Sequence, residues 1–139
     1  MNPERAPSEP PQPAARPRPL RVLIADDERD SLVTLGLLCR DAGMDVQLLR
    51  RGEEVPSAVA NFGPDVVLLD LAMPDRGGLD LAEDLSERYG DNVPWLIAVT
   101  AYASEADRQM AKASGFHDFI AKPYDPQSLL QRLALIKPR

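Results

Sequence analysis

The chain has 139 residues, a formal net charge of −6 and a single cysteine. This length supports one ordinary domain rather than two. One cysteine excludes an internal disulfide and a zinc knuckle, and no apolar run approaches the ~18 residues of a membrane span or forms a signal peptide. We therefore expect a cytoplasmic protein with no membrane association. The acidic balance, without a cluster of Lys and Arg between aromatic residues, argues against nucleic acid as a partner.

The amino-terminal segment, residues 1–19, differs in composition from the rest of the chain. It holds seven of the fourteen prolines and, after Met1, no apolar residue larger than alanine. Such a segment cannot bury enough apolar surface to offset the entropy of ordering its backbone, so we predict a disordered leader with polyproline II character. Its P-x-x-P spacings arise by chance in so proline-rich a stretch, which favours a linker over a docking motif. The folded domain is expected over residues 20–139.

From Leu20 onward, short apolar runs alternate with longer stretches in which apolar residues recur every three or four positions. The first pattern is typical of strands and the second of amphipathic helices. Three of the runs are apolar throughout, as is typical of parallel strands that are buried on both faces. The predicted strands are residues 20–25, 46–49, 65–69, 94–99 and 118–121.

Each stretch between or after these runs has one apolar stripe at helical spacing. The stripes are Leu32/Leu35/Leu38/Cys39/Ala42, Val55/Ala58/Val59/Phe62, Leu79/Ala82/Leu85, Ala106/Met110/Ala113 and Leu129/Leu130/Leu133/Ile136. Gly43, Gly63, Gly90 and Gly115 fall where helices should end, and Ser104 is the expected N-cap of the fourth helix. Alternating strands and helices predict an α/β fold, a flavodoxin-like (βα)5 three-layer sandwich around a five-stranded parallel sheet of order 2-1-3-4-5.

Polar side chains follow four of the five predicted strands. The first strand is followed by Asp26 and Asp27, the third by Asp70, the fourth by Thr100 and the fifth by Lys122. Right-handed crossovers bring the carboxyl ends of all parallel strands to one edge, where ligands bind. Strands one and three are neighbours in the predicted order, so the three carboxylates should share one crevice.

Three neighbouring carboxylates repel one another and need a compensating cation or strong donors. Ligation by carboxylate oxygens, with room for water and a phosphate oxygen, is typical of Mg2+. The Lys122 ammonium and the Thr100 hydroxyl on the other side would meet the oxygens of a phosphoryl group attached to Asp70. Phosphoryl transfer needs little more than such positioning and charge neutralisation.

With these residues in place, the chain resembles the receiver domains of bacterial two-component response regulators, including the chemotaxis receivers. The resemblance covers residues 21–136 and rests on five motifs that match the family in order and spacing. They are Asp26-Asp27-Glu28, the D-L-A-M-P motif from Asp70 to Pro74, Gly77-Gly78, Thr100-Ala101 and Lys122-Pro123.

The resemblance implies a role for each matching residue. Asp70 is the expected phosphoacceptor, supplied by a histidine kinase or a histidine phosphotransfer protein. Asp27 and Asp70 would bind Mg2+ directly, Asp26 through water, and Ala72 through its backbone carbonyl. Two further residues would form a switch, in which Thr100 closes over the phosphoryl group and Phe119 turns inward. The resemblance also implies that Lys122 pairs with the phosphoryl group and that the peptide bond after it is cis.

Simpler interpretations exist for several of these residues. Asp26 and Asp27 alone could cap the next helix, and Thr100 alone could be a structural strand residue. Phe119 has the spacing of a core residue, Cys39 that of a small buried apolar side chain, and His117 is expected at the surface. The joint presence of Asp70 and Lys122 favours the functional interpretation.

The receiver interpretation leaves the output of the protein open. We expect a signalling protein rather than an enzyme, with chemistry limited to self-phosphorylation and self-dephosphorylation of Asp70. Its expected output is contact with a downstream protein through the fourth helix, fifth strand and fifth helix, as a monomer or a phosphorylation-dependent dimer. The alternatives are a receiver cut from a hybrid sensor kinase, a receiver that works without phosphorylation, and an aspartate-nucleophile phosphatase. The phosphatase requires a D-x-D motif after its first strand, which is absent here.

Overall fold

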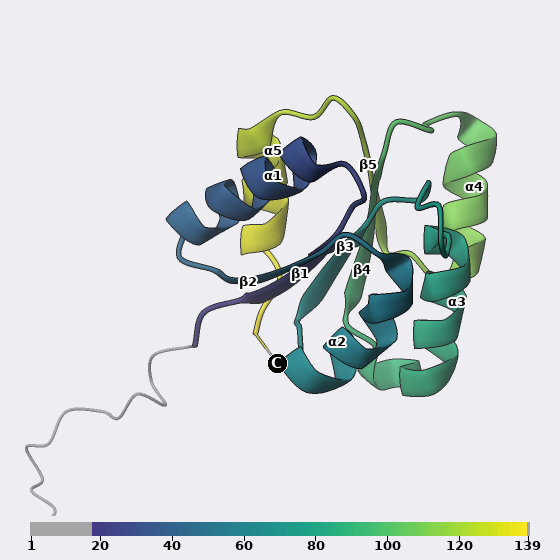
Figure 1. Cartoon of the computed structure of the whole chain (residues 1–139), viewed down its shortest axis with the longest axis horizontal. Coiled ribbons are helices and arrows are strands. Elements are labelled where there is room, and N and C mark those ends of the chain that lie inside the picture. The colour runs from purple at the N-terminus through teal and green to yellow at the C-terminus, as the bar shows by residue number, and fades with distance from the viewer. Residues whose placement is uncertain (1–17, 139) are drawn as a thin grey trace, which may run out of the picture.

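The computed structural model describes residues 18–138, so most of the predicted leader, residues 1–19, lies outside the described part. Strands and helices alternate along this part (Figure 1). In chain order they are β1 (Arg21–Ala25), α1 (Arg29–Asp41), β2 (Asp45–Leu49), α2 (Val55–Phe62), β3 (Val66–Leu69), α3 (Gly78–Tyr89), β4 (Trp95–Thr100), α4 (Glu105–Ser114), β5 (Asp118–Ala121) and α5 (Pro126–Ala134). Two short 3-10 turns, Gly52–Glu54 (η2) and Gly90–Asn92 (η3), precede α2 and follow α3.

The five strands form one parallel sheet of order β2-β1-β3-β4-β5, which confirms the predicted topology. Helices α1 and α5 cover one face of the sheet, and α2, α3 and α4 cover the other (Figure 1). The result is the predicted three-layer sandwich. Strand boundaries differ from the prediction by one residue at most.

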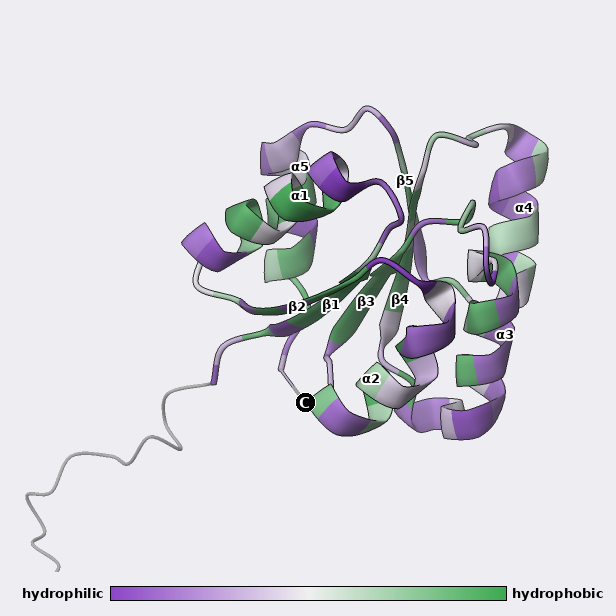
Figure 2. Ribbon diagram, in the orientation of Figure 1, coloured by the Kyte–Doolittle hydropathy of each residue, from purple (hydrophilic) through white to green (hydrophobic). Residues whose placement is uncertain are grey.

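The core has two halves because successive side chains of a strand point to opposite faces of the sheet. In β1, Leu23 packs with the α2, α3 and α4 layer, whereas Val22 and Ile24 pack with α1 and α5. Figure 2 shows the strands as the most hydrophobic layer, between helices that are hydrophilic on their outer sides. Cys39 is fully buried in the α1 half, as predicted, and burial raises the pKa of its thiol to about 11.

The apolar stripe predicted for α4 is wrong. Ala106, Met110 and Ala113 are all exposed, and the helix instead buries Ala111 and Ser114. Small side chains let α4 pack closely against α3, so the helix needs no row of large apolar residues on its inner face. Met110 keeps 55% of its surface exposed, so an apolar stripe runs along the otherwise polar outer side of α4. Helix α3 shows a smaller difference, since it buries Leu81 fully and Leu79 only in part.

The predicted helix ends are confirmed. Gly63, Gly90 and Gly115 follow the last residues of their helices and have positive φ angles, which L side chains adopt only at a cost. Ser104 caps α4, where its Oγ accepts a hydrogen bond from the Asp107 N–H at 3.0 Å and the Asp107 carboxylate accepts one from the Ser104 N–H. None of the helices within residues 18–138 is long and apolar enough to cross a membrane.

His117, the residue before β5, packs against the start of β4. Its ring stacks on Trp95 with 4.1 Å between centroids, and its Nδ1 accepts a hydrogen bond from the Leu96 N–H at 2.9 Å. Partial burial lowers the pKa of His117 below its ordinary value of 6.5. As the pH falls through 6.5, the unfolded chain therefore takes up this proton before the folded chain does.

We predict that this difference makes His117 a source of acid sensitivity. The stability that neutral His117 contributes is present above pH 6.5 and is lost as the pH falls toward the lower folded-state pKa. Urea unfolding of the wild type should therefore show a larger fall between about pH 7.5 and about pH 5.5 than unfolding of His117→Gln, which does not titrate. Equal pH dependence in the two proteins would contradict this assignment.

Candidate functional site

The carboxyl edge of the sheet brings three aspartates together. Asp26 and Asp27 follow β1, Asp70 follows β3, and these two strands are neighbours. The Asp70 N–H donates to the Ala25 carbonyl at 3.0 Å, so the strand register continues past the last residue of β3. One carboxylate oxygen from each aspartate lies within 4.8 Å of the others. The predicted crevice is therefore present.

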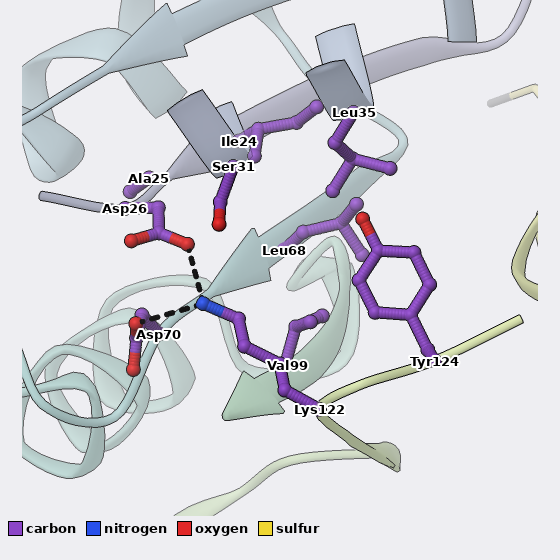
Figure 3. Close-up of a pocket in the computed structure, with 10 residues that line it drawn as sticks. All are labelled: Ile24, Ala25, Asp26, Ser31, Leu35, Leu68, Asp70, Val99, Lys122 and Tyr124. Carbon is purple, nitrogen blue, oxygen red and sulfur yellow. Dashed lines mark hydrogen bonds and ion pairs between the residues drawn. The ribbon is translucent and has the colours of Figure 1, made fainter. Parts of the chain in front are cut away.

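Lys122, which follows β5, reaches into the same crevice. Its Nζ lies 2.7 Å from Oδ2 of Asp26 and 3.3 Å from Oδ2 of Asp70. Figure 3 shows the ammonium between the two carboxylates. The Lys122 backbone N–H donates to the Thr100 carbonyl at 2.9 Å, and the peptide bond to Pro123 is cis, as the family resemblance implies.

Each of the two carboxylates that face Lys122 is held by a second donor. Oδ1 of Asp26 accepts a hydrogen bond from the Glu28 N–H at 2.9 Å, and Oδ1 of Asp70 accepts one from the Ala72 N–H at 3.0 Å. Gly78, the first residue of α3, lies against the same loop, because a Cβ there would come 2.7 Å from the Asp70 carbonyl oxygen. The glycine at this position thus lets α3 begin directly beside Asp70.

Burial and charge act against each other in this crevice. Burial raises the pKa of Asp26 above its ordinary value and outweighs the opposite effects of the hydrogen bonds from Lys122 and Glu28. Burial by itself lowers the pKa of Lys122, but the Asp26 hydrogen bond and the charge of Asp70 outweigh it and raise that pKa. Three carboxylates against one ammonium leave two negative charges unbalanced.

This donor set fits a divalent cation that prefers oxygen ligands. Carboxylate oxygens suit Mg2+, which keeps several waters and takes one or two protein carboxylates. The two unbalanced charges match the charge of the ion. Asp27 is half-buried and Asp70 is partly open, so the carboxylate cluster can be reached from solvent. The predicted backbone ligand, the carbonyl of Ala72, remains a prediction.

Thr100 and Phe119 are not among the residues that line the crevice. Thr100 is fully buried at the end of β4, and its Oγ1 accepts a hydrogen bond from the Tyr102 N–H at 3.1 Å. Phe119, in β5, is partly buried, and the Arg108 guanidinium of α4 lies 4.7 Å from the centroid of its ring. The switch movement predicted for this pair remains a prediction.

Sequence reasoning missed two residues, one in the loop that follows Asp70 and one in the crevice lining. Asp75 accepts hydrogen bonds from the N–H groups of Gly52 and Glu53 at 3.0 and 2.9 Å, and so ties the loop after β3 to the turn after β2. Tyr124 lines the crevice together with Lys122, and its ring lies beside Leu35 and Leu68 (Figure 3). The position of Tyr124, directly after the Lys122-Pro123 motif, could have indicated that it lies at the site. Nothing in the sequence indicates that Asp75 contacts Gly52.

Comparison with known proteins agrees with this geometry. The sequence profile of the response regulator receiver domain matches residues 22–134, so the chain belongs to that family. It is 36% identical over 111 residues to an uncharacterized 14.6 kDa protein of Leptolyngbya boryana, covering 79% of this chain and 84% of that protein. It is 33% identical over 113 residues to the DNA-binding response regulator MtrA of Mycolicibacterium paratuberculosis, covering 81% of this chain and 49% of MtrA. The chain thus spans about half the length of that regulator.

Solved structures with this fold include other receiver domains. The crystal structure of a CheY-like receiver domain protein from Methanospirillum hungatei superposes with a TM-score of 0.78 at 26% identity, covering 84% of this chain and 92% of that one. Receiver domains are signalling proteins rather than ordinary enzymes, and they bind Mg2+ at an acidic pocket. Response regulators act together with histidine kinases and downstream targets.

Proposed function

We propose that Asp70 accepts a phosphoryl group from the phosphohistidine of a histidine kinase or a histidine phosphotransfer protein. An oxygen of the Asp70 carboxylate attacks phosphorus, the phosphorus–nitrogen bond breaks, and the donor imidazole leaves with a proton. The observation that carries this proposal is the cluster of Asp26, Asp27 and Asp70 within 4.8 Å, with the Lys122 ammonium 3.3 Å from Asp70. An attacking carboxylate flanked by a fixed cation fits phosphoryl transfer, in which catalysis is mostly positioning and charge neutralisation.

The other site residues have supporting roles in this proposal. Asp27 and Asp70 hold Mg2+ directly, Asp26 acts through water and the Ala72 carbonyl adds a ligand. The ion supplies neutralisation of the negative charge that phosphoryl transfer brings into the crevice. The Lys122 ammonium gives up part of its ion pairing with the carboxylates and pairs with the phosphoryl oxygens instead. The Thr100 hydroxyl donates a hydrogen bond to the same oxygens. The donor set of three carboxylates and two unbalanced charges supports this assignment.

We further propose that phosphorylation changes a surface formed by α4, β5 and α5, through which a downstream protein binds. The exposed apolar stripe of α4, with Met110, supports a protein contact there. Phe119 lies under the Arg108 guanidinium of α4 and lines a pocket with residues of α5, so a turn of its ring would disturb this surface. Movement of Thr100 toward the phosphoryl group would start that change. The protein would act in the cytoplasm as a monomer or as a dimer formed on phosphorylation.

Beryllofluoride, a tetrahedral analogue of a phosphoryl group, provides a test of the acceptor site. The wild-type protein with Mg2+, beryllium and fluoride should give bound fluorine resonances and a higher melting temperature, and omission of Mg2+ should remove both. Asp70→Asn should show neither effect, whereas the exposed change Asp91→Asn should leave both intact. Absence of binding in the wild type, or equal binding in Asp70→Asn, would overturn the proposal and favour a receiver that works without phosphorylation.

We predict that the phosphorylated form is long-lived for a receiver. Ala72, two residues after Asp70, has no side-chain donor to orient a hydrolytic water. Tyr102, two residues after Thr100, is a bulky neighbour, but it is 59% exposed and does not line the crevice. The double variant Ala72→Asn with Tyr102→Ala should lose its acyl phosphate several-fold faster, mostly through Ala72→Asn. Decay followed by intact-mass spectrometry that is unchanged or slower in the double variant would refute this prediction.

A further inference from the structure

A second cleft lies at the end of the sheet opposite the acidic site. Trp95, at the start of β4, lines it, whereas Thr100 at the end of the same strand belongs to the edge that carries Asp70. The cleft volume is about 450 Å3, compared with about 10 Å3 for the crevice at Lys122. Its walls also come from α5 and the residues after it, from the start of β5 and from Asp65 before β3.

Two large apolar side chains of the cleft are exposed to solvent. Leu135, after the last residue of α5, keeps 83% of its surface exposed, and Trp95 keeps 43%. The indole is also held in place, because it stacks on the His117 ring with an angle of 17° between the planes. A fixed aromatic platform beside an exposed leucine is the kind of surface that binds proline-rich chains in an extended polyproline II conformation.

Charged groups surround this apolar centre. Asp118, at the start of β5, pairs with Arg132 of α5 at 2.9 Å, and both side chains remain partly open to solvent. Lys137 adds a positive charge to the lining, whereas the Asp65 carboxylate is already held by Arg18. The rim therefore offers partners to both basic and acidic side chains.

The chain enters the described domain beside this cleft. The two terminal guanidinium nitrogens of Arg18 each donate to one carboxylate oxygen of Asp65, both at 2.8 Å. Asp65 lines the cleft and keeps only 1% of its surface exposed. The ion pair therefore holds the Arg18 side chain beside the cleft. The first described residue is thus tied to one wall of the cleft that Trp95 and Leu135 also line.

We propose that residues 1–17 bind in this cleft of their own domain, with proline rings on Trp95 and Leu135. This segment holds six prolines, and polyproline II advances about 3.1 Å per residue, so eight of its residues extend over about 25 Å. Its two arginines, Arg5 and Arg16, complement the Asp118 carboxylate, and its two glutamates complement the basic groups of the rim. The occupant is thus matched in both apolar and charged character.

The tether makes even a weak contact significant. A segment held at one end by a short connection has an effective concentration on the order of millimolar at its site. The proposal departs from the interpretation of the segment as a mere linker, because it gives the prolines a binding surface. An external partner for the Trp95 cleft would first have to displace the segment. This contact does not require phosphorylation of Asp70.

Fluorescence of Trp95, the single tryptophan of the chain, gives a direct readout. Three full-length proteins are compared for quenching by acrylamide: the wild type, the triple variant Pro10→Gly, Pro11→Gly, Pro13→Gly, and the matched control Ala6→Gly, Ala14→Gly, Ala15→Gly. A contact of millimolar affinity at millimolar effective concentration covers Trp95 in about half of the molecules, so the wild-type quenching constant should be about half that of the proline variant. The alanine control should behave as the wild type does.

A change in the cleft itself provides the second arm. Leu135→Ser alters an exposed side chain. This variant should have a higher quenching constant than the wild type, close to that of the proline variant. Combined with the three proline changes, it should have no further effect. Equal quenching in the wild type and the proline variant would overturn the proposal. Shielding of Trp95 that grows with protein concentration would overturn it as well, because the occupant would then be the segment of another copy.

Discussion

Replacement of Asp65 by alanine is expected to lower the free energy of unfolding by about 3 kcal/mol, because one side chain serves several groups at the start of the sheet. The carboxylate is 1% exposed and accepts hydrogen bonds from the Arg18 guanidinium and from the Arg21 backbone N–H, each at 2.8 Å. Alanine would remove the acceptor of the Arg21 N–H and the carboxylate that pairs with the Arg18 guanidinium. Arg18 keeps a third of its side-chain surface exposed, so water offsets part of the cost.

Urea unfolding followed by circular dichroism measures this loss. Asp91→Ala is the matched control, because it makes the same chemical change at an exposed position and should stay within about 0.5 kcal/mol of the wild type. A loss in Asp65→Ala as small as that of the control would show that the ion pair contributes little. The same result would also weaken the tether on which the Trp95 cleft proposal depends.

Saturating Mg2+ is expected to stabilise the folded protein, by about 2.7 kcal/mol at a hundredfold excess over its Kd. The ion would bind the three clustered carboxylates of the native state and not the unfolded chain. Asp27→Ala should abolish this gain, because it removes a direct ligand. In the absence of metal the same variant should be slightly more stable than the wild type, since one of three mutually repelling carboxylates is gone.

The opposite signs of these two effects make the Asp27→Ala experiment specific. Simple damage to the fold would lower stability with and without Mg2+, whereas loss of a metal ligand lowers it only with Mg2+. Thermal unfolding over a Mg2+ titration separates the two cases, with Asp91→Ala again as the control. A full Mg2+ response in Asp27→Ala would remove this residue from the metal site.

The fold was predictable because its three central strands, β1, β3 and β4, are buried on both faces. Residues 22–24, 66–69 and 96–99 are apolar throughout, and only a covered parallel sheet accommodates such runs at this length. The prediction failed for α4. Ala106, Met110 and Ala113 form a regular apolar stripe at helical spacing, yet all three are exposed. Periodicity alone does not distinguish an apolar stripe that packs on the core from an apolar stripe that is exposed to solvent.

The candidate site was predictable where chemistry and topology coincide. Asp26, Asp27, Asp70 and Lys122 each follow a strand, and a parallel sheet brings such positions to one edge. The contribution of Asp75 was not predictable, because its partners are backbone N–H groups more than 20 residues earlier in the chain. The hydrogen bond that the Thr100 Oγ1 accepts from the Tyr102 N–H likewise depends on local backbone geometry that no sequence pattern encodes.

The most direct test of the central claim, that Asp70 is a Mg2+-dependent phosphoacceptor, is intact-mass spectrometry after incubation with acetyl phosphate. The wild type should gain about 80 Da, the mass of one phosphoryl group, only when Mg2+ is present. Asp70→Asn should gain nothing under either condition, and Asp91→Asn should match the wild type. An adduct that forms without Mg2+ or persists in Asp70→Asn would contradict the claim, as would a wild type that gains no mass and shows no stabilisation by Mg2+.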